Sequence, residues 1–148
     1  MRDYITHKGI DRVLDANINR AKEGLRVCED ICRFVIDNAR LTSEFKQIRH
    51  AIEENATRYT QLSCLLKERS ALKDSGRLIH THSELTRKDV RDIFFANIQR
   101  AKESVRVLEE FSKLKNFRCA LHYKQLRYRV YELEKKAALQ LAALCHTR

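Results

Sequence analysis

The chain contains an internal repeat, and this repeat limits the folds that it can adopt. Residues 16–34 read ANINRAKEGLRVCEDICRF, and residues 96–114 read ANIQRAKESVRVLEEFSKL. Ten of these 19 aligned positions are identical. A second pair of matching segments follows, FKQIRHAI at 45–52 and YKQLRYRV at 123–130. This order predicts a duplicated pair of elements joined by one irregular connection.

The repeated segments have the spacing of amphipathic helices, with apolar residues every three or four positions. The 148 residues include three glycines and no proline, which suits long helices better than turn-rich β folds. We predict one all-α domain over 1–148, a four-helix bundle-like fold of two antiparallel hairpins. Repeat one covers about 9–68, the central loop 69–88, and repeat two about 88–146. The first helix is expected over about Gly9–Asn38 and the second from Thr42 to Leu66. The third is expected to start at Thr86, because Thr86-x-x-Asp89 has capping-box spacing. The fourth is expected to start at about Arg118.

The charge composition narrows the class of partner. The formal net charge is +10, which favours anionic ligands. Basic residues are interleaved with 20 acidic ones, a pattern of salt-bridged helix faces more than of a nucleic-acid-binding surface. No apolar run approaches the length of a membrane span and the N-terminal residues lack a signal-peptide core. We expect a cytoplasmic protein that binds neither nucleic acid nor membrane.

Polar residues interrupt the apolar stripe at the same places in both repeats. Asn17 and Arg20 lie on the inward arc of the first helix, and Asn97 and Arg100 repeat them on the third. Core patterning alone gives little reason to keep an asparagine and an arginine in both copies. These four residues are therefore candidates for structural networks or for a binding site.

Two interpretations of these residues remain open. In the first, Arg20 pairs with Glu23 and Arg100 pairs with Glu103, three residues away on the same helix, because a buried arginine needs a carboxylate or an anion. In the second, a polar cleft between the hairpins holds phosphate groups. Further arginines at the stripe edges fit either interpretation: Arg49 and Arg127.

Other polar and sulfur-containing residues give weaker signals. Cys28 and Cys32 lie on the apolar arc without a nearby histidine, which favours core packing over metal binding. The segment 69–88 is long for a connection without regular structure, and such loops are often functional. Four charged residues are assigned to the outer face, where their retention in both copies is compatible with a subunit interface: Lys22, Arg26, Glu29 and Arg33.

The repeated string AN-x-x-RA-x-E-x-x-RV-x-E, the K-Q-x-R segments and the central Asp-x-Gly…T-x-S-E motif resemble a known family. The chain is similar to the domain found in front of some thiamine phosphate synthases, which is regarded as a non-ribokinase type of hydroxymethylpyrimidine phosphate kinase. The resemblance spans about Gly9–Glu134. The positions that match its motifs are Asn17, Arg20, Glu23, Arg26, Glu29, Arg49, His50, Arg69, Asp74, Gly76, Thr81, Ser83, Glu84, Asn97, Arg100, Glu103, Arg106 and Glu109.

The resemblance implies ATP-dependent phosphorylation of hydroxymethylpyrimidine phosphate to the diphosphate, with ATP and Mg²⁺ as cofactors. Phosphoryl transfer needs cations around the transferred group and carboxylates that hold the metal. The catalytic residues are then Arg20, Glu23, Arg100, Glu103 and Asp74, of which Glu23, Glu103 and Asp74 bind the metal. The residues that bind substrate or phosphate are Asn17, Asn97, Arg49, Arg69, Gly76, Thr81 and Ser83.

One departure from the family pattern supports an alternative function. The family has an aspartate directly after the loop arginine, whereas this chain has Ser70 after Arg69. The alternative is a non-catalytic helical module that forms oligomers, or that binds a ligand, in association with thiamine phosphate synthase. The partners expected are a phosphorylated pyrimidine, a nucleotide, thiamine phosphate synthase and further copies of the chain.

Overall fold

The computed structural model describes residues 9–146, and all regular secondary structure within them is helical. This confirms the all-α prediction. The elements in chain order are α2 (Ile10–Phe34), α3 (Ala39–Tyr59), α4 (Leu62–Glu68), the 3-10 helix η1 (Ala71–Lys73), α5 (His82–Leu85), α6 (Val90–Ser112) and α7 (Phe117–His146).

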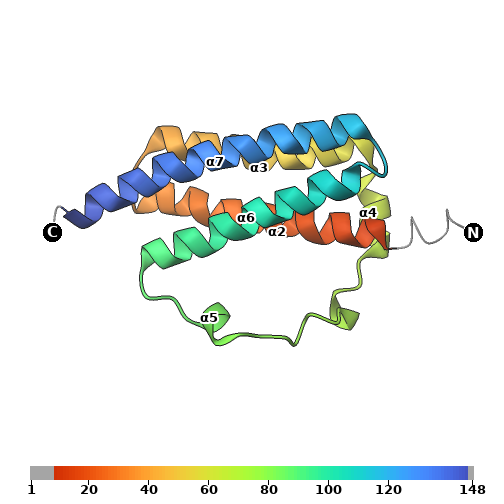
Figure 1. Ribbon diagram of the computed structural model, residues 1–148, viewed down its shortest axis with the longest axis horizontal. Coiled ribbons are helices and arrows are strands. Elements are labelled where there is room, and N and C mark those ends of the chain that lie inside the picture. Colours follow the sequence, from red (N-terminus) through yellow and green to blue (C-terminus); the bar gives the residue numbers. More distant parts are fainter. Residues whose placement is uncertain (1–8, 147–148) are drawn as a thin grey trace, which may run out of the picture.

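Four long helices form an antiparallel bundle (Figure 1). Among the described residues, α2 contacts α3 and α6, and α7 contacts α6 and α3, so each long helix has two long neighbours; α2 also contacts the short helix α4. The pairs α2–α3 and α6–α7 are the two predicted hairpins. The two hairpins are joined by residues 60–89, here called the connecting segment, which carries α4, η1 and α5. Its part with η1 and α5 runs along the outside of the bundle on the side of α2 and α6 (Figure 1).

The helix ends differ from the sequence prediction in ways that local hydrogen bonds explain. Asn38 begins α3 because its side chain accepts a hydrogen bond from the Leu41 N–H at 3.0 Å. The second helix ends at Tyr59, since Thr60 is extended. The expected start at Thr86 is wrong: Asp89 caps α6 by accepting from the Asp92 N–H. A capping box is present earlier, at the start of α5.

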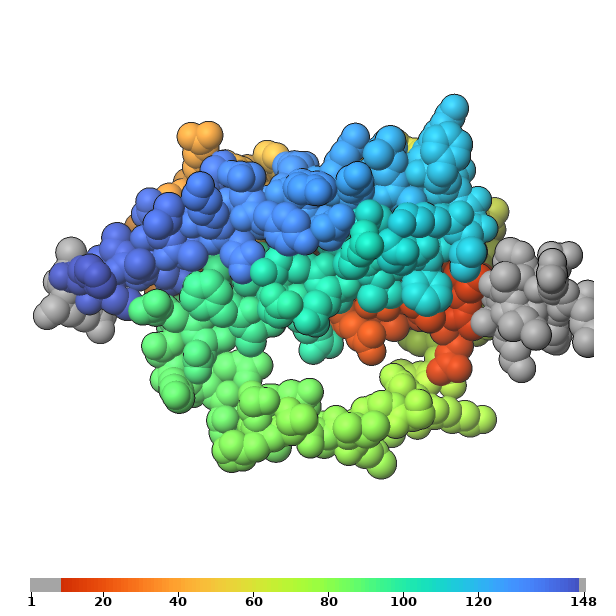
Figure 2. All heavy atoms as spheres, viewed as in Figure 1, coloured from red at the N-terminus to blue at the C-terminus, as the bar shows by residue number. Residues whose placement is uncertain are grey.

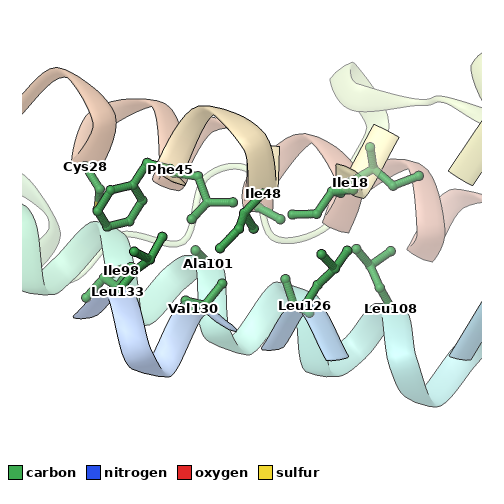
Figure 3. Close-up of a cluster of buried hydrophobic side chains, with 14 of the residues drawn as sticks. Ile18, Cys28, Phe45, Ile48, Ile98, Ala101, Leu108, Leu126, Val130 and Leu133 are labelled. Carbon is green, nitrogen blue, oxygen red and sulfur yellow. The ribbon is translucent and has the colours of Figure 1, made fainter. Parts of the chain in front are cut away.

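The apolar core lies between the four long helices, and each contributes to it (Figure 3). Cys28 and Cys32 are both fully buried in it, as their positions on the apolar arc predicted. Burial raises the pKa of the Cys32 thiol to about 12, so this side chain stays protonated at neutral pH. Residues labelled in Figure 3 are Ile18, Cys28, Phe45, Ile48, Ile98, Ala101, Leu108, Leu126, Val130 and Leu133.

Helices α2 and α6 approach closely at Gly24. A Cβ atom at this position would lie 2.6 Å from the carbonyl oxygen of Asn97, closer than any real contact. Its counterpart in the second repeat is Ser104, whose Oγ donates to the Arg100 carbonyl oxygen at 2.7 Å. The absence of a side chain at Gly24 therefore allows the close approach of the two repeats. Helices α2 and α6, which meet here, both contribute residues to the cleft described below.

Candidate functional site

A cleft of about 730 Å³ opens between α2 and the first part of the connecting segment. The space-filling view shows the hollow between this segment and the bundle (Figure 2). Its lining comes from the N-terminal half of α2, from residues 69–74 and from Val107 of α6. The predicted site residues in this lining are Asn17, Arg20, Glu23, Arg69 and Asp74.

The connecting segment is tied to α2 by an ion pair at the edge of this cleft. Arg69 donates from Nε and Nη2 to the two carboxylate oxygens of Asp15, at 2.7 Å each. Asp15 is buried, and its hydrogen bond and charge raise the pKa of Arg69. Arg69, predicted to bind phosphate, thus directs its guanidinium fork to a protein carboxylate. Sequence reasoning did not identify Asp15, although it stands where the second repeat has Phe95.

Two other arginines of the cleft have no such partner in the part of the chain that the structure describes. Arg12 and Arg20 both line it and are exposed, and neither makes a side-chain hydrogen bond or ion pair within residues 9–146. The expectation that Arg20 and Arg100 point into the core is wrong. The bundle buries Asn17 and Ala21, which lie next to Arg20, whereas Arg20 and Arg100 are both exposed. Arg12 was not predicted, because it precedes the repeat.

The paired asparagines have equivalent geometry. Asn17 donates from Nδ2 to the Val13 carbonyl oxygen and Asn97 to that of Ile93, each at 2.8 Å and four residues back. The amide oxygen of Asn17 accepts no hydrogen bond from the described residues, and Asn17 lines the cleft. Asn97 lies outside the cleft lining. The two repeats thus share the side-chain geometry but only one copy meets the cleft.

The carboxylates predicted to bind a metal each have another partner. Glu23 pairs with Arg100 across the two repeats at 3.6 Å. Glu103 accepts from Gln99 at 3.0 Å. Asp74 accepts from the Gly76 N–H at 2.9 Å in its own turn. Within residues 9–146, no three histidine, cysteine or acidic side chains come together to hold a metal. The ATP and Mg²⁺ expectations remain predictions.

The remaining predicted binding residues lie outside the cleft lining. Thr81 and Ser83 share a hydrogen bond between their hydroxyl groups at 3.0 Å, and Thr81 caps α5. Gly76 lies in an exposed turn. Arg49 lies on α3, where its Nε donates to Glu29 at 2.9 Å. The roles assigned to these residues remain predictions.

Internal ion pairs are present in both repeats, but they involve other residues than expected. Glu29 is 4% exposed and accepts from Arg49. Glu109 is also 4% exposed and accepts from Arg127 at 2.8 Å. The predicted pairs of Arg20 with Glu23 and of Arg100 with Glu103 are therefore wrong, as is the outer-face position of Glu29. The side of α2 that carries Glu29 is covered by α3 and so requires a buried counter-charge.

No helix within residues 9–146 has both the length and the apolar content needed to cross a membrane.

Comparison with known proteins identifies relatives of the whole bundle. The ThiD2 family matches residues 12–136. A thiamine-phosphate synthase of Synechocystis sp. is 43% identical over 125 residues, covering 84% of this chain and 35% of the relative. A thiamine-phosphate synthase of Nostoc punctiforme is 39% identical over 123 residues, covering 83% of the chain and 34% of the relative. The chain thus spans about a third of the length of these relatives. No solved structure matches.

These relatives correct the expected activity. Proteins at 32–43% identity carry the name thiamine-phosphate synthase and not the name of a kinase. The expectation of an ATP-dependent phosphomethylpyrimidine kinase is therefore contradicted. The comparisons support the relationship to thiamine biosynthesis, and they fit better with the alternative of a non-catalytic module associated with the synthase.

Proposed function

The chain belongs to the ThiD2 family, and we propose that it is a ligand-binding module that works with a thiamine-phosphate synthase. Its ligand is a phosphorylated small molecule of that biosynthesis, for which a phosphorylated hydroxymethylpyrimidine is the probe of choice. The module binds this compound in the cleft between α2 and residues 69–74. The matched relatives contain a domain of this kind within a longer synthase, where such a module would hold the compound close to the synthase reaction.

The observation that carries the proposal is the pair of cations, Arg12 and Arg20, that line the cleft without a side-chain partner among residues 9–146. A phosphate group has up to two negative charges and several acceptor oxygens, which match two guanidiniums. In contrast, Arg69 is already neutralised by Asp15, and it serves to hold the connecting segment in place. The cleft therefore has two arginines available to a ligand among the described residues, and a wall that the pair of Asp15 and Arg69 fixes.

The polar groups beside the two arginines suit a heteroaromatic ring. The buried Asn17 presents an amide oxygen that can accept a hydrogen bond from an exocyclic amino group. Asn19 also lines the cleft, and its amide donates to the Asp15 carbonyl oxygen at 2.9 Å. The volume of about 730 Å³ lies within the usual range of small-molecule sites, about 300–1,000 Å³.

Calorimetric titration with the phosphorylated pyrimidine and with its unphosphorylated alcohol tests this function. We expect the phosphorylated compound to bind more tightly, since only it contacts the arginines. Arg20→Ala should weaken binding about 10-fold or more, because a hydrogen bond to a charged group contributes about 1.5–3 kcal/mol. Arg12→Ala should act in the same direction.

Arg58→Ala is the matched control, because Arg58 is an exposed arginine on α3 outside the cleft. This variant loses the same net charge and should bind as the wild type does. Equal loss of affinity in Arg58→Ala and Arg20→Ala would show only a general charge effect. Absence of binding by the wild-type protein would contradict the proposed function.

A further inference from the structure

The outer faces of α3 and α7 occupy equivalent places in the two repeats and can be compared position by position. Asn38 precedes α3 and Asn116 precedes α7, and each side chain accepts a hydrogen bond from a backbone N–H of the first turn. Aligned from these caps, the dipeptide Lys-Gln occurs at 46–47 and again at 124–125. The internal duplication thus gives each residue of α7 from Phe117 to Ala137 a reference residue on α3.

The comparison shows a stripe of exposed apolar side chains on one side of α7, interrupted by Gln125, Glu132 and Lys135, that α3 lacks. Ser43 and His50 on α3 correspond to Leu121 and Tyr128 on α7. Leu121 is 50% exposed and Tyr128 is 56% exposed. Leu139 lies five helical turns after Leu121, on the same side, and is 63% exposed. Because α3 is polar at the positions of Leu121 and Tyr128, the fold itself does not require apolar residues there. Leu139 lies beyond the part of α7 that aligns with α3. The stripe indicates an interaction surface.

The centre of the stripe is already ordered. The rings of Tyr128 and Tyr131 pack edge to face, with centroids 5.8 Å apart. Arg127 lies over both rings, 5.2 and 5.7 Å from their centroids, and donates to the Tyr131 hydroxyl at 2.9 Å. Arg127 is in turn held by the buried Glu109. Tyrosine and arginine are enriched at the energetic centres of interfaces, and ordering before binding reduces the entropic cost.

We propose that the stripe on α7 binds the same stripe of a second copy of this chain, with the two α7 helices antiparallel. An interface of this kind must be self-complementary about a two-fold axis. Leu121 and Leu139 are equally far from Val130, and so are Tyr128 and Glu132. An axis at the level of Val130 therefore places Leu121 against Leu139 of the second copy. It also places the Tyr128 hydroxyl against the Glu132 carboxylate of the second copy, a donor facing an acceptor.

The exposed length of α7 is sufficient for such an interface. The helix has 30 residues and is therefore about 45 Å long, and it runs uncovered along the edge of the molecule (Figure 2). Interfaces of ordinary size bury about 800 Å² per partner. The net charge of +10 per chain opposes association of two copies, so added salt should strengthen an apolar dimer by screening this repulsion. Binding of an acidic partner would weaken under the same change.

Sedimentation velocity over a range of protein concentrations, in low and in higher salt, tests the proposal. We expect the wild-type chain to form a species of twice the mass of one chain, with a larger dimer fraction in higher salt. The double variant Leu121→Ser, Tyr128→His gives α7 the residues that α3 has at these positions. It should remain monomeric at concentrations where the wild type is a dimer, with an unchanged circular dichroism spectrum.

Leu78→Ser combined with Ile79→Ser is the matched control. These side chains are exposed in the connecting segment, so the control removes apolar surface of comparable size elsewhere and should leave the dimer intact. A monomeric wild type at all concentrations would overturn the proposal, as would a dimer that persists in the α7 variant and disappears in the control. The ligand cleft does not enter this test, because no residue of the stripe lines it.

Discussion

The Asp15 carboxylate accepts two hydrogen bonds of 2.7 Å from the Arg69 guanidinium, joining α2 to a residue 54 positions further along the chain. This pair fixes the wall of the cleft at the point where the connecting segment leaves α4. Beyond it, residues 71–89 are all exposed. The width of the cleft near Arg12 and Arg20 therefore depends on this ion pair.

Replacing Asp15 should loosen that wall. Asp15→Asn keeps the size of the side chain and removes the charge that holds Arg69, so amide hydrogen exchange at residues 69–74 should become faster. The core helices should exchange as before, because Asp15 is not part of the apolar core. Asp74→Asn is the control, since Asp74 bonds only within its own turn. Unchanged exchange at 69–74 in Asp15→Asn would show that other contacts hold the segment.

The buried carboxylate Glu29 should make Arg49 important for stability. Among the described residues, Arg49→Ala leaves Glu29 with only the longer contact to Arg26, at 3.4 Å. We therefore expect a loss of about 3 kcal/mol in the free energy of unfolding. Arg20→Ala, at an exposed position without a side-chain partner among the described residues, should change it by less than about 1 kcal/mol. Urea denaturation measures both.

A second substitution separates this ion pair from a simple loss of packing. Glu29→Gln in the Arg49→Ala background removes the stranded charge and should recover part of the stability. If Arg20→Ala proves more destabilising than Arg49→Ala, the assignment of structural and cleft-lining arginines is reversed.

The close approach of the two repeats should not tolerate a larger residue at position 24. Gly24→Ala introduces a Cβ that would lie 2.6 Å from the Asn97 carbonyl oxygen. Because this oxygen belongs to the backbone of a helix, it cannot move away by a change of rotamer as a side-chain atom can. We expect the variant to lose about 1–3 kcal/mol of stability by thermal or urea unfolding, despite the better helix propensity of alanine. Ser104→Ala, at the equivalent position, should be milder, and a more stable Gly24→Ala protein would contradict the close packing.

Two buried thiols should make the fold sensitive to high pH. Desolvation by burial raises the pKa of Cys28, and it raises that of Cys32 to about 12 from the ordinary 9.0. The unfolded chain releases both protons near pH 9, while the folded chain retains them, so the unfolded state binds fewer protons above that pH. The contribution of the two thiols to the free energy of unfolding is therefore fully present below about pH 9. Above that pH, the free energy of unfolding falls by about 1.4 kcal/mol per pH unit for each thiol.

Urea denaturation at several pH values between 8 and 11 measures this slope. Cys32→Ala should flatten it, whereas Cys64→Ala should not, since Cys64 is exposed. A slope that is the same in both variants would assign the pH dependence to other groups.

The repeat and the apolar periodicity were enough to predict the four long helices and their pairing, because both depend on local spacing. They did not predict which face of α2 is covered. A helix wheel places Arg20 on the inward arc, but α2 has only two long neighbours, and the side of Arg20 stays open while the side of Glu29 is covered by α3.

Contacts between distant residues explain the rest of what the sequence did not predict. The pair of Asp15 with Arg69 and the pair of Glu23 with Arg100 join parts of the chain that no local pattern relates. Asp15 is moreover absent from the second repeat, where Phe95 replaces it, so the comparison of repeats that identified Asn17 and Arg20 passed over it.

Hydrogen exchange of the wild-type protein with and without the phosphorylated pyrimidine tests the central claim most directly. If the cleft is the binding site, the ligand should slow exchange in the first turns of α2, around Arg12–Arg20, and at residues 69–74, and it should leave α3 and α7 unchanged. Slower exchange confined to α7 or to residues 76–86, or no change at saturating ligand, would contradict the account.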